Sequence, residues 1–121
     1  MTVKHISAIT LIVSNMSRSA GFYKDLGFVR LLGGPNERFA SYKIGASFLN
    51  LASSSRDDAR PQRLWGRLIF HVDDVDALYQ LALDKGLKPE AEPRDAEWGE
   101  RYFHLRDPDG HGLSFAKVLE E

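Results

Sequence analysis

The sequence predicts an α+β protein built from two tandem βαβββ modules, and a repeated pattern leads to this prediction. The pattern of residues 8–27 recurs in residues 67–86, fifty-nine positions later. Each copy reads as an apolar strand, a polar helix cap, an amphipathic helix and a closing glycine, and turn residues divide the rest of each module into short strands. Because helix start, helix end and the next apolar residue keep one offset, we interpret the copies as a duplication rather than a coincidence.

Length and composition favour one fused domain. The chain has 121 residues and is 43% hydrophobic, which suffices for one buried core, whereas two independent domains would each be marginal. We therefore expect a single domain over residues 1–121, with module one at about 4–53, a linker at 54–66 and module two at about 67–118.

Charge and cysteine content exclude several classes of function. A formal charge of −1 argues against nucleic acid or an anionic membrane as partner. The chain has no cysteine, so disulfides and thiolate chemistry are excluded. The longest apolar run, Ile9 to Val13, is too short to span a bilayer, and we expect a cytoplasmic protein.

The first module opens with residues 4–13, whose two alternating sets are both apolar, as expected for a strand buried on both faces. Asn15 or Ser14 can cap the following helix, and Gly27 closes it. The apolar stripe of this helix comprises Met16, Ala20, Phe22, Tyr23 and Leu26. Three strands are expected next, separated by turn residues, at 28–32, 38–44 and 47–52.

The second module repeats this plan after a polar, aperiodic linker, at whose end Leu64 and Trp65 are expected to pack onto the body or a partner subunit. Asp73 or Asp74 caps the second helix and Gly86 ends it. Strands are expected at 88–92, 100–106 and 112–118. Before the last strand stands a strong turn signal, Asp107-Pro108-Asp109-Gly110.

Two βαβββ units with a late Asp-Pro-Asp-Gly hairpin resemble the vicinal oxygen chelate superfamily, which includes glyoxalase I, bleomycin-resistance proteins, extradiol dioxygenases and fosfomycin-resistance enzymes. The likeness is carried by residues 19–28 (SAGFYKDLGF), 72–78 (VDDVDAL) and 107–111 (DPDGH), and it covers nearly the whole chain. It implies that the modules form one curled mixed-sheet cavity, with helices on the convex face and the site on the concave face. The residues then expected to line the cavity are Ala8, Thr10, Ile12, Arg67, Ile69 and His71.

The resemblance also shows where a metal would be held. Metal-using members place up to four ligands, usually His and Glu or Gln, at positions that fall here on Ala8, Asn50, Arg67 and Ser114. None of the four is a good ligand for a divalent ion, so we expect no metal and no cofactor. A displaced site that uses His71 and His104 remains the alternative, although each histidine is more simply interpreted as a surface or structural residue.

Arg67 would leave a cation on the cavity wall, with Asn50, Ser114 and Thr10 as neutral partners, which suits an anionic or carbonyl-bearing ligand. The competing interpretation is a structural ion pair of Arg67 with Glu100, Glu97 or Asp57. Residues 98–103 resemble the Trp-Gly strand of bleomycin-resistance-like members, and one of Tyr102 and Phe103 should be core. The expected ligand-binding set is Arg67, Asn50, Ser114, Thr10, His71, Phe48, Trp98, Tyr102 and His104.

Two classes of function are implied by the resemblance. The favoured one is a metal-independent binding protein that sequesters or carries an anionic or aromatic small molecule in the cavity between modules, in a homodimer. The alternative is an enzyme of the glyoxalase or dioxygenase type, with a displaced metal or with Arg67 and a histidine as electrostatic stabiliser and acid–base group. The sequence leaves open whether a reaction is catalysed.

Overall fold

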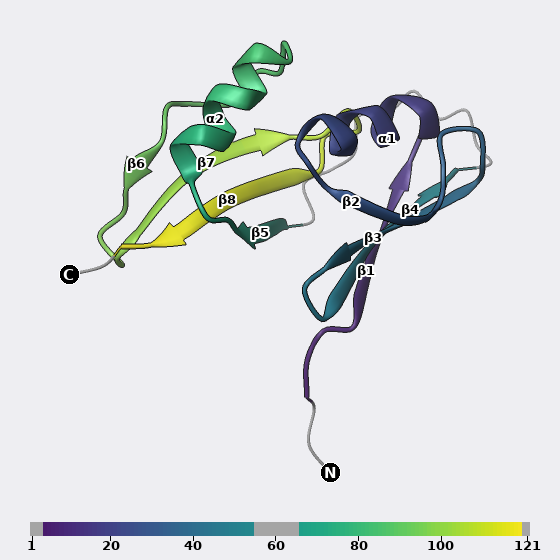
Figure 1. Cartoon of the computed structure of the whole chain (residues 1–121), viewed down its shortest axis with the longest axis horizontal. Helices are drawn as coiled ribbons and strands as arrows, with labels where there is room; N and C mark the ends of the chain where they lie inside the picture. The colour runs from purple at the N-terminus through teal and green to yellow at the C-terminus, as the bar shows by residue number, and fades with distance from the viewer. Residues whose placement is uncertain (1–3, 55–65, 120–121) are drawn as a thin grey trace. The chain divides into compact units, whose positions relative to one another are not determined.

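The computed structural model describes residues 4–54 and 66–119, which fall in two compact units, residues 1–60 and 61–121. Each unit contains one four-stranded mixed sheet and one helix that belongs to it (Figure 1). The predicted α+β fold of two βαβββ modules is thereby confirmed. Most of the predicted linker, including Leu64 and Trp65, lies outside the described residues.

The first unit has the strand order β1-β4-β3-β2. Its β1 and β4 are parallel, and the other neighbouring strands are antiparallel. The elements are β1 (Ala8–Val13), α1 (Met16–Asp25), β2 (Val29–Gly33), β3 (Phe39–Ile44) and β4 (Ser47–Ser53).

The second unit has the same topology, with the order β5-β8-β7-β6. Here β5 and β8 are the parallel pair. The elements are β5 (Arg67–His71), α2 (Val75–Asp84), β6 (Arg94–Asp95), β7 (Glu100–Arg106) and β8 (Gly112–Val118).

The helix caps repeat with the predicted offset. Asn15 accepts a hydrogen bond from the backbone N–H of Arg18 at 3.0 Å. Asp74, fifty-nine residues later, accepts one from Ala77 at 3.0 Å. After each helix a glycine takes a positive φ, 87° at Gly27 and 78° at the corresponding Gly86, as a closing residue should.

Each helix packs on one face of its own sheet, α1 against β4 and α2 against β7 and β8 (Figure 1). Aromatic rings fill both cores: Tyr23 lies edge-on to Phe28 in the first unit, and Phe103 lies edge-on to Tyr79 of α2 in the second. The largest fully buried side chains are Tyr23, Tyr42, Phe103, Phe115, Leu51, Leu105, Leu113 and Val13. Helix-covered and open sheet faces therefore differ in composition, and the open faces can display polar groups.

Two strand predictions were wrong. The first strand covers Ala8–Val13 rather than residues 4–13, and only one of its faces is buried: Leu11 and Val13 are covered, whereas Ile12 is 48% exposed. Residues 88–92 are not a strand, and the edge strand β6 follows them at Arg94–Asp95. Prolines at positions 89 and 93 remove ladder donors, and that segment makes a single backbone bond, from the Glu90 N–H to the His104 carbonyl.

Candidate functional site

The candidate site lies on the open face of the second unit's sheet. Residues paired across neighbouring strands share a face, and the pairs Ile69 with Ser114 and Ser114 with His104 align three side chains in one row. Phe103, the residue before His104 on β7, points to the opposite face of the sheet, where it contacts Tyr79 of α2. His104 and Ser114 therefore belong to the face that α2 does not cover.

Arg67, Ser114 and His104 form a connected polar network. The Arg67 side chain passes over Gly112, and its Nη1 donates to the Ser114 hydroxyl at 3.4 Å and to the Leu113 carbonyl at 3.3 Å. The Nδ1 atom of His104 lies 2.7 Å from the same hydroxyl. Ser114 is only 3% exposed, so its hydroxyl is oriented by these two neighbours rather than by water.

The protonation of His104 follows from its surroundings. Burial, with the positive charge of Arg67 as the next cause, lowers the pKa of His104 below its ordinary value of 6.5. The imidazole is therefore neutral at neutral pH. Because Ser114 accepts from Arg67, its own proton can go to Nδ1, which leaves the ring proton on Nε2. The face then presents two kinds of donor, a guanidinium and an imidazole N–H.

Glu90 is a neighbour of Arg67 that sequence reasoning missed. Its carboxylate oxygens lie 3.8 Å from Arg67 Nη1 and 3.6 Å from Arg106 Nε, and the Arg67 and Glu90 side chains are 29% and 38% exposed. Ion pairs this long and this exposed contribute little and hold neither partner firmly. The guanidinium of Arg67 is therefore positioned mainly by Ser114 and Leu113.

Of the three acidic residues considered as ion-pair partners of Arg67, Glu100 and Glu97 do not pair with it in the described parts of the chain. Glu100 instead contacts His71, whose Nε2 is 2.9 Å from its carboxylate, and accepts a hydrogen bond from Trp98 at 2.8 Å. Asp57 lies outside the described residues. Among the described residues, Arg67 instead makes a loose contact with Glu90.

An aromatic row lies beside the polar network. Trp98 stacks on Tyr102 with 5.7 Å between ring centres, and Tyr102 contacts the His104 ring at 4.9 Å. Arg94 covers the Tyr102 ring at 5.4 Å and donates to its hydroxyl at 2.7 Å. Phe103, 1% exposed, is the core member of the adjacent pair, which leaves Tyr102 on the open face. With Trp98 69% exposed, the row can accept a planar ligand.

The first unit gathers the remaining predicted residues into a neutral chain. Asn50 accepts a hydrogen bond from Ser41 at 2.7 Å and donates to Thr10 at 3.3 Å. Phe48, two residues before Asn50 on β4, is half-buried on the same face. Ser41 was not predicted, and its signal is the strand register that pairs it with Asn50.

The donor set is a poor fit to a divalent metal. Of the four positions that the resemblance indicates, Asn50 and Ser114 offer neutral oxygens that already hold hydrogen bonds, Arg67 is a cation and Ala8 has no donor atom. His71 and His104 bond to different partners, Glu100 and Ser114. Within residues 4–54 and 66–119 there is no group of three His, Cys, Asp or Glu residues that could hold a metal ion.

Comparison with known proteins places this fold in a family. Residues 3–115 match the sequence profile described as the Glyoxalase/Bleomycin resistance protein/Dioxygenase superfamily. The chain belongs to that superfamily. Within it, the chain is 32% identical over 126 aligned positions to the uncharacterized protein YraH of Bacillus subtilis strain 168, with 92% of this chain and 96% of YraH covered.

Solved structures of similar fold include members named after the superfamily or an activity. One is a glyoxalase/bleomycin resistance protein/dioxygenase from Nocardioides, with a TM-score of 0.76, 18% identity, and 99% of this chain and 87% of that one covered. Another is a lactoylglutathione lyase from Agrobacterium tumefaciens, with a TM-score of 0.76, 22% identity, and 96% and 95% covered. At these identities the superfamily members share the fold with this chain and nothing finer.

Proposed function

We propose that this superfamily member binds a small anionic organic molecule with an aromatic body on the open sheet face of the second unit, without a divalent metal. The observation that supports the proposal is the network in which buried Ser114 holds Arg67 and neutral His104 together. Charge-assisted donors of this kind suit a carboxylate or a similar oxyanion.

The aromatic row supplies the apolar half of the recognition. Tyr102 and Trp98 extend the face from His104, so a planar ring could stack there while its carboxylate reaches Arg67. The proposal therefore specifies an aromatic carboxylate, with the charge and the ring recognised by different residues. We also propose, from the superfamily resemblance, that the protein acts as a cytoplasmic homodimer in which binding itself is the function.

The test is a titration with 2-naphthoate followed by residue-specific NMR. We expect saturable shifts of the backbone amides of Tyr102, His104 and Ser114, and an affinity lowered about tenfold or more by Arg67→Gln. Arg38→Gln is the matched control, because it removes the same charge from an exposed arginine of the first unit and should leave the affinity unchanged.

Two further measurements test whether binding depends on the charge of the ligand and whether it depends on a divalent metal. The neutral analogue 2-naphthamide should bind more weakly than 2-naphthoate, because it offers the guanidinium no charge to pair with. Binding of 2-naphthoate should be the same in EDTA and after addition of Zn²⁺ or Mn²⁺. Equal affinity of Arg67→Gln and wild type, or binding that requires the added metal, would reject the proposal.

A further inference from the structure

The first unit contains a hollow on the helix side of its sheet, away from its neutral chain of Thr10, Ser41 and Asn50. The hollow has a volume of about 580 Å³ and lies where α1 meets β2 and β3. The residues that line it and matter here are Ser17, Gly21, Lys24, Phe28, Arg30 and Tyr42. None of them belongs to the predicted ligand-binding set.

Tyr42, one of the residues that line the hollow, has an unused hydrogen-bond donor. The residue is 1% exposed, and its hydroxyl has no hydrogen-bond partner anywhere in the described parts of the chain. Burial raises the pKa of Tyr42, so the hydroxyl keeps its proton and remains a donor. A buried donor without an acceptor is unfavourable, and a ligand oxygen in the hollow would remove that penalty.

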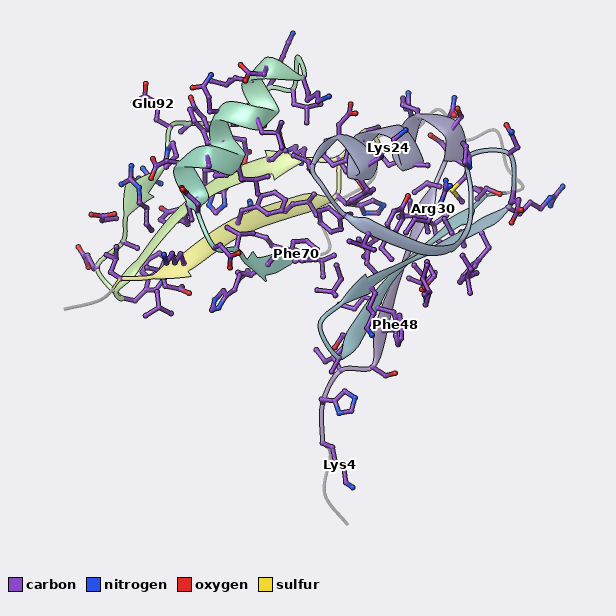
Figure 2. The ribbon with its side chains drawn as sticks, in the orientation of Figure 1. Lys4, Lys24, Arg30, Phe48, Phe70 and Glu92 are labelled. Carbon is purple, nitrogen blue, oxygen red and sulfur yellow. The ribbon has the colours of Figure 1, made fainter. Side chains whose placement is uncertain are left out.

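Two cations border the same hollow, and no carboxylate of the described residues lines it. Figure 2 labels both, Lys24 on α1 and Arg30 on β2, and neither forms an ion pair with a carboxylate in the part of the chain that the structure describes. Arg30 Nη1 lies over Gly34, 3.3 Å from where a Cβ would stand, so a larger residue there would displace the guanidinium. The charge of Arg30 reaches Tyr42, because it opposes the rise in the tyrosine pKa.

Gly21 leaves the helix wall of the hollow open. Glycine is unfavourable inside a helix, yet it occupies the middle of α1, and a Cβ built there would meet no atom within 4 Å. A side chain at this position would enter free space that lines the hollow. The half-buried ring of Phe28 offers an apolar contact beside that space.

We propose that this hollow is a second binding site, for a small carboxylate carried on an apolar ring. The Tyr42 hydroxyl donates to the carboxylate, Arg30 and Lys24 neutralise it, and the ring lies over Gly21 and against Phe28. The site is separate from the proposed function of the second unit and does not depend on it.

Benzoate is the probe, titrated into the full chain with NMR detection of each backbone amide. We expect saturable shifts at Gly21, Lys24 and Tyr42 that persist in Arg67→Gln. Benzyl alcohol should bind more weakly because it lacks the charge, and inorganic phosphate should bind more weakly because it lacks the ring. Equal shifts with phosphate, or no shifts at these residues, would overturn the proposal.

Three substitutions assign the roles. Tyr42→Phe and Arg30→Gln should each lower benzoate affinity about tenfold, and Gly21→Leu should abolish binding by filling the space. Tyr79→Phe, which removes a hydroxyl from a half-buried tyrosine of α2, is the matched control and should change nothing. The melting temperature of Tyr42→Phe without ligand should be at least that of the wild type, since the substitution deletes an unpaired buried group. Unchanged benzoate affinity in folded Tyr42→Phe would refute the assigned donor.

Discussion

The two units share one backbone plan but differ in the side chains that line its open face and its helix side. In the first unit the open face carries the neutral chain of Thr10, Ser41 and Asn50, and cations border a hollow on the helix side. In the second unit the open face carries Arg67 and His104. A duplicated fold thus fixes where side chains can point, and the residue types at those places determine what each copy can bind.

Corresponding positions show how this difference arises. Lys24 of α1 corresponds to Leu83 of α2 at the offset of fifty-nine, and Gly21 corresponds to Gln80. By strand register the counterpart of the buried Tyr42 on β3 is Leu105 on β7, which is also buried but has no hydroxyl. The packing on the helix side therefore differs between the units: the hollow of the first lies beside Gly21 and Lys24, and that of the second lies at the start of α2, beside Asp74 and Asp76.

The largest expected effect tests this packing. Phe103→Ala should lower the free energy of unfolding by about 3–5 kcal/mol, the range for a large-to-small change in a core, because the ring is 1% exposed and contacts both Phe115 and Tyr79. Urea unfolding measures the change. Phe28→Ala, at a half-buried ring beside the hollow, is the comparison and should cost clearly less. Equal losses would show that the two helix sides are packed alike.

A second expected effect concerns the hairpins. The first unit turns between β3 and β4 through Gly45 and Ala46 alone, whereas the second uses a longer turn in which Asp107 accepts backbone N–H bonds from Asp109 at 3.0 Å and His111 at 2.9 Å. Asp107 is 4% exposed. Asp107→Ala should therefore cost about 1–3 kcal/mol of stability, measured by urea unfolding. A change of a few tenths would contradict the role of this carboxylate.

Much of the fold was predictable because its signals are local. Caps, helices and closing glycines were found where expected, and β7 and β8 have the predicted bounds, Glu100–Arg106 and Gly112–Val118. Caps and turns depend on residues only a few positions apart, and alternation alone places a side chain on one face of a strand.

No helix in the described part of the chain is long and apolar enough to cross a membrane.

The candidate site was less predictable, because its contacts join residues far apart in sequence. The contact between Arg67 and Ser114 depends on the register of β5 and β8, and the contact with Glu90 depends on a segment mistaken for a strand. Periodicity indicates which face a residue shares, but not which hydrogen bond it makes there. Arg67, Ser114 and His104 were all named as expected ligand-binding residues, which stays a prediction, and the contact of Arg67 with Glu90 was not foreseen.

The helix caps are expected to respond equally in the two units, which sharpens the comparison. Asn15→Ala and Asp74→Ala each remove one side-chain acceptor from a backbone N–H at 3.0 Å, so each should cost about 1 kcal/mol. The measurement is urea unfolding of both variants under one set of conditions. If only one of the two substitutions lowers the free energy of unfolding, the equal cap geometry of the two units does not give equal stabilisation.

The smallest expected effect is a pH dependence confined to the second unit, where three of the four histidines lie. His104, which faces Arg67, Glu90 and Arg94, has a pKa below 6.5 in the fold, so the unfolded chain binds more protons in the interval below that value. Stability should therefore rise with pH through this interval and be lost as pH falls below about 6.5. In His104→Gln the melting temperature should fall less steeply between neutral and mildly acidic pH. His5→Gln, at the exposed histidine of the first unit, should keep the wild-type slope, and equal flattening in both variants would remove His104 as the source.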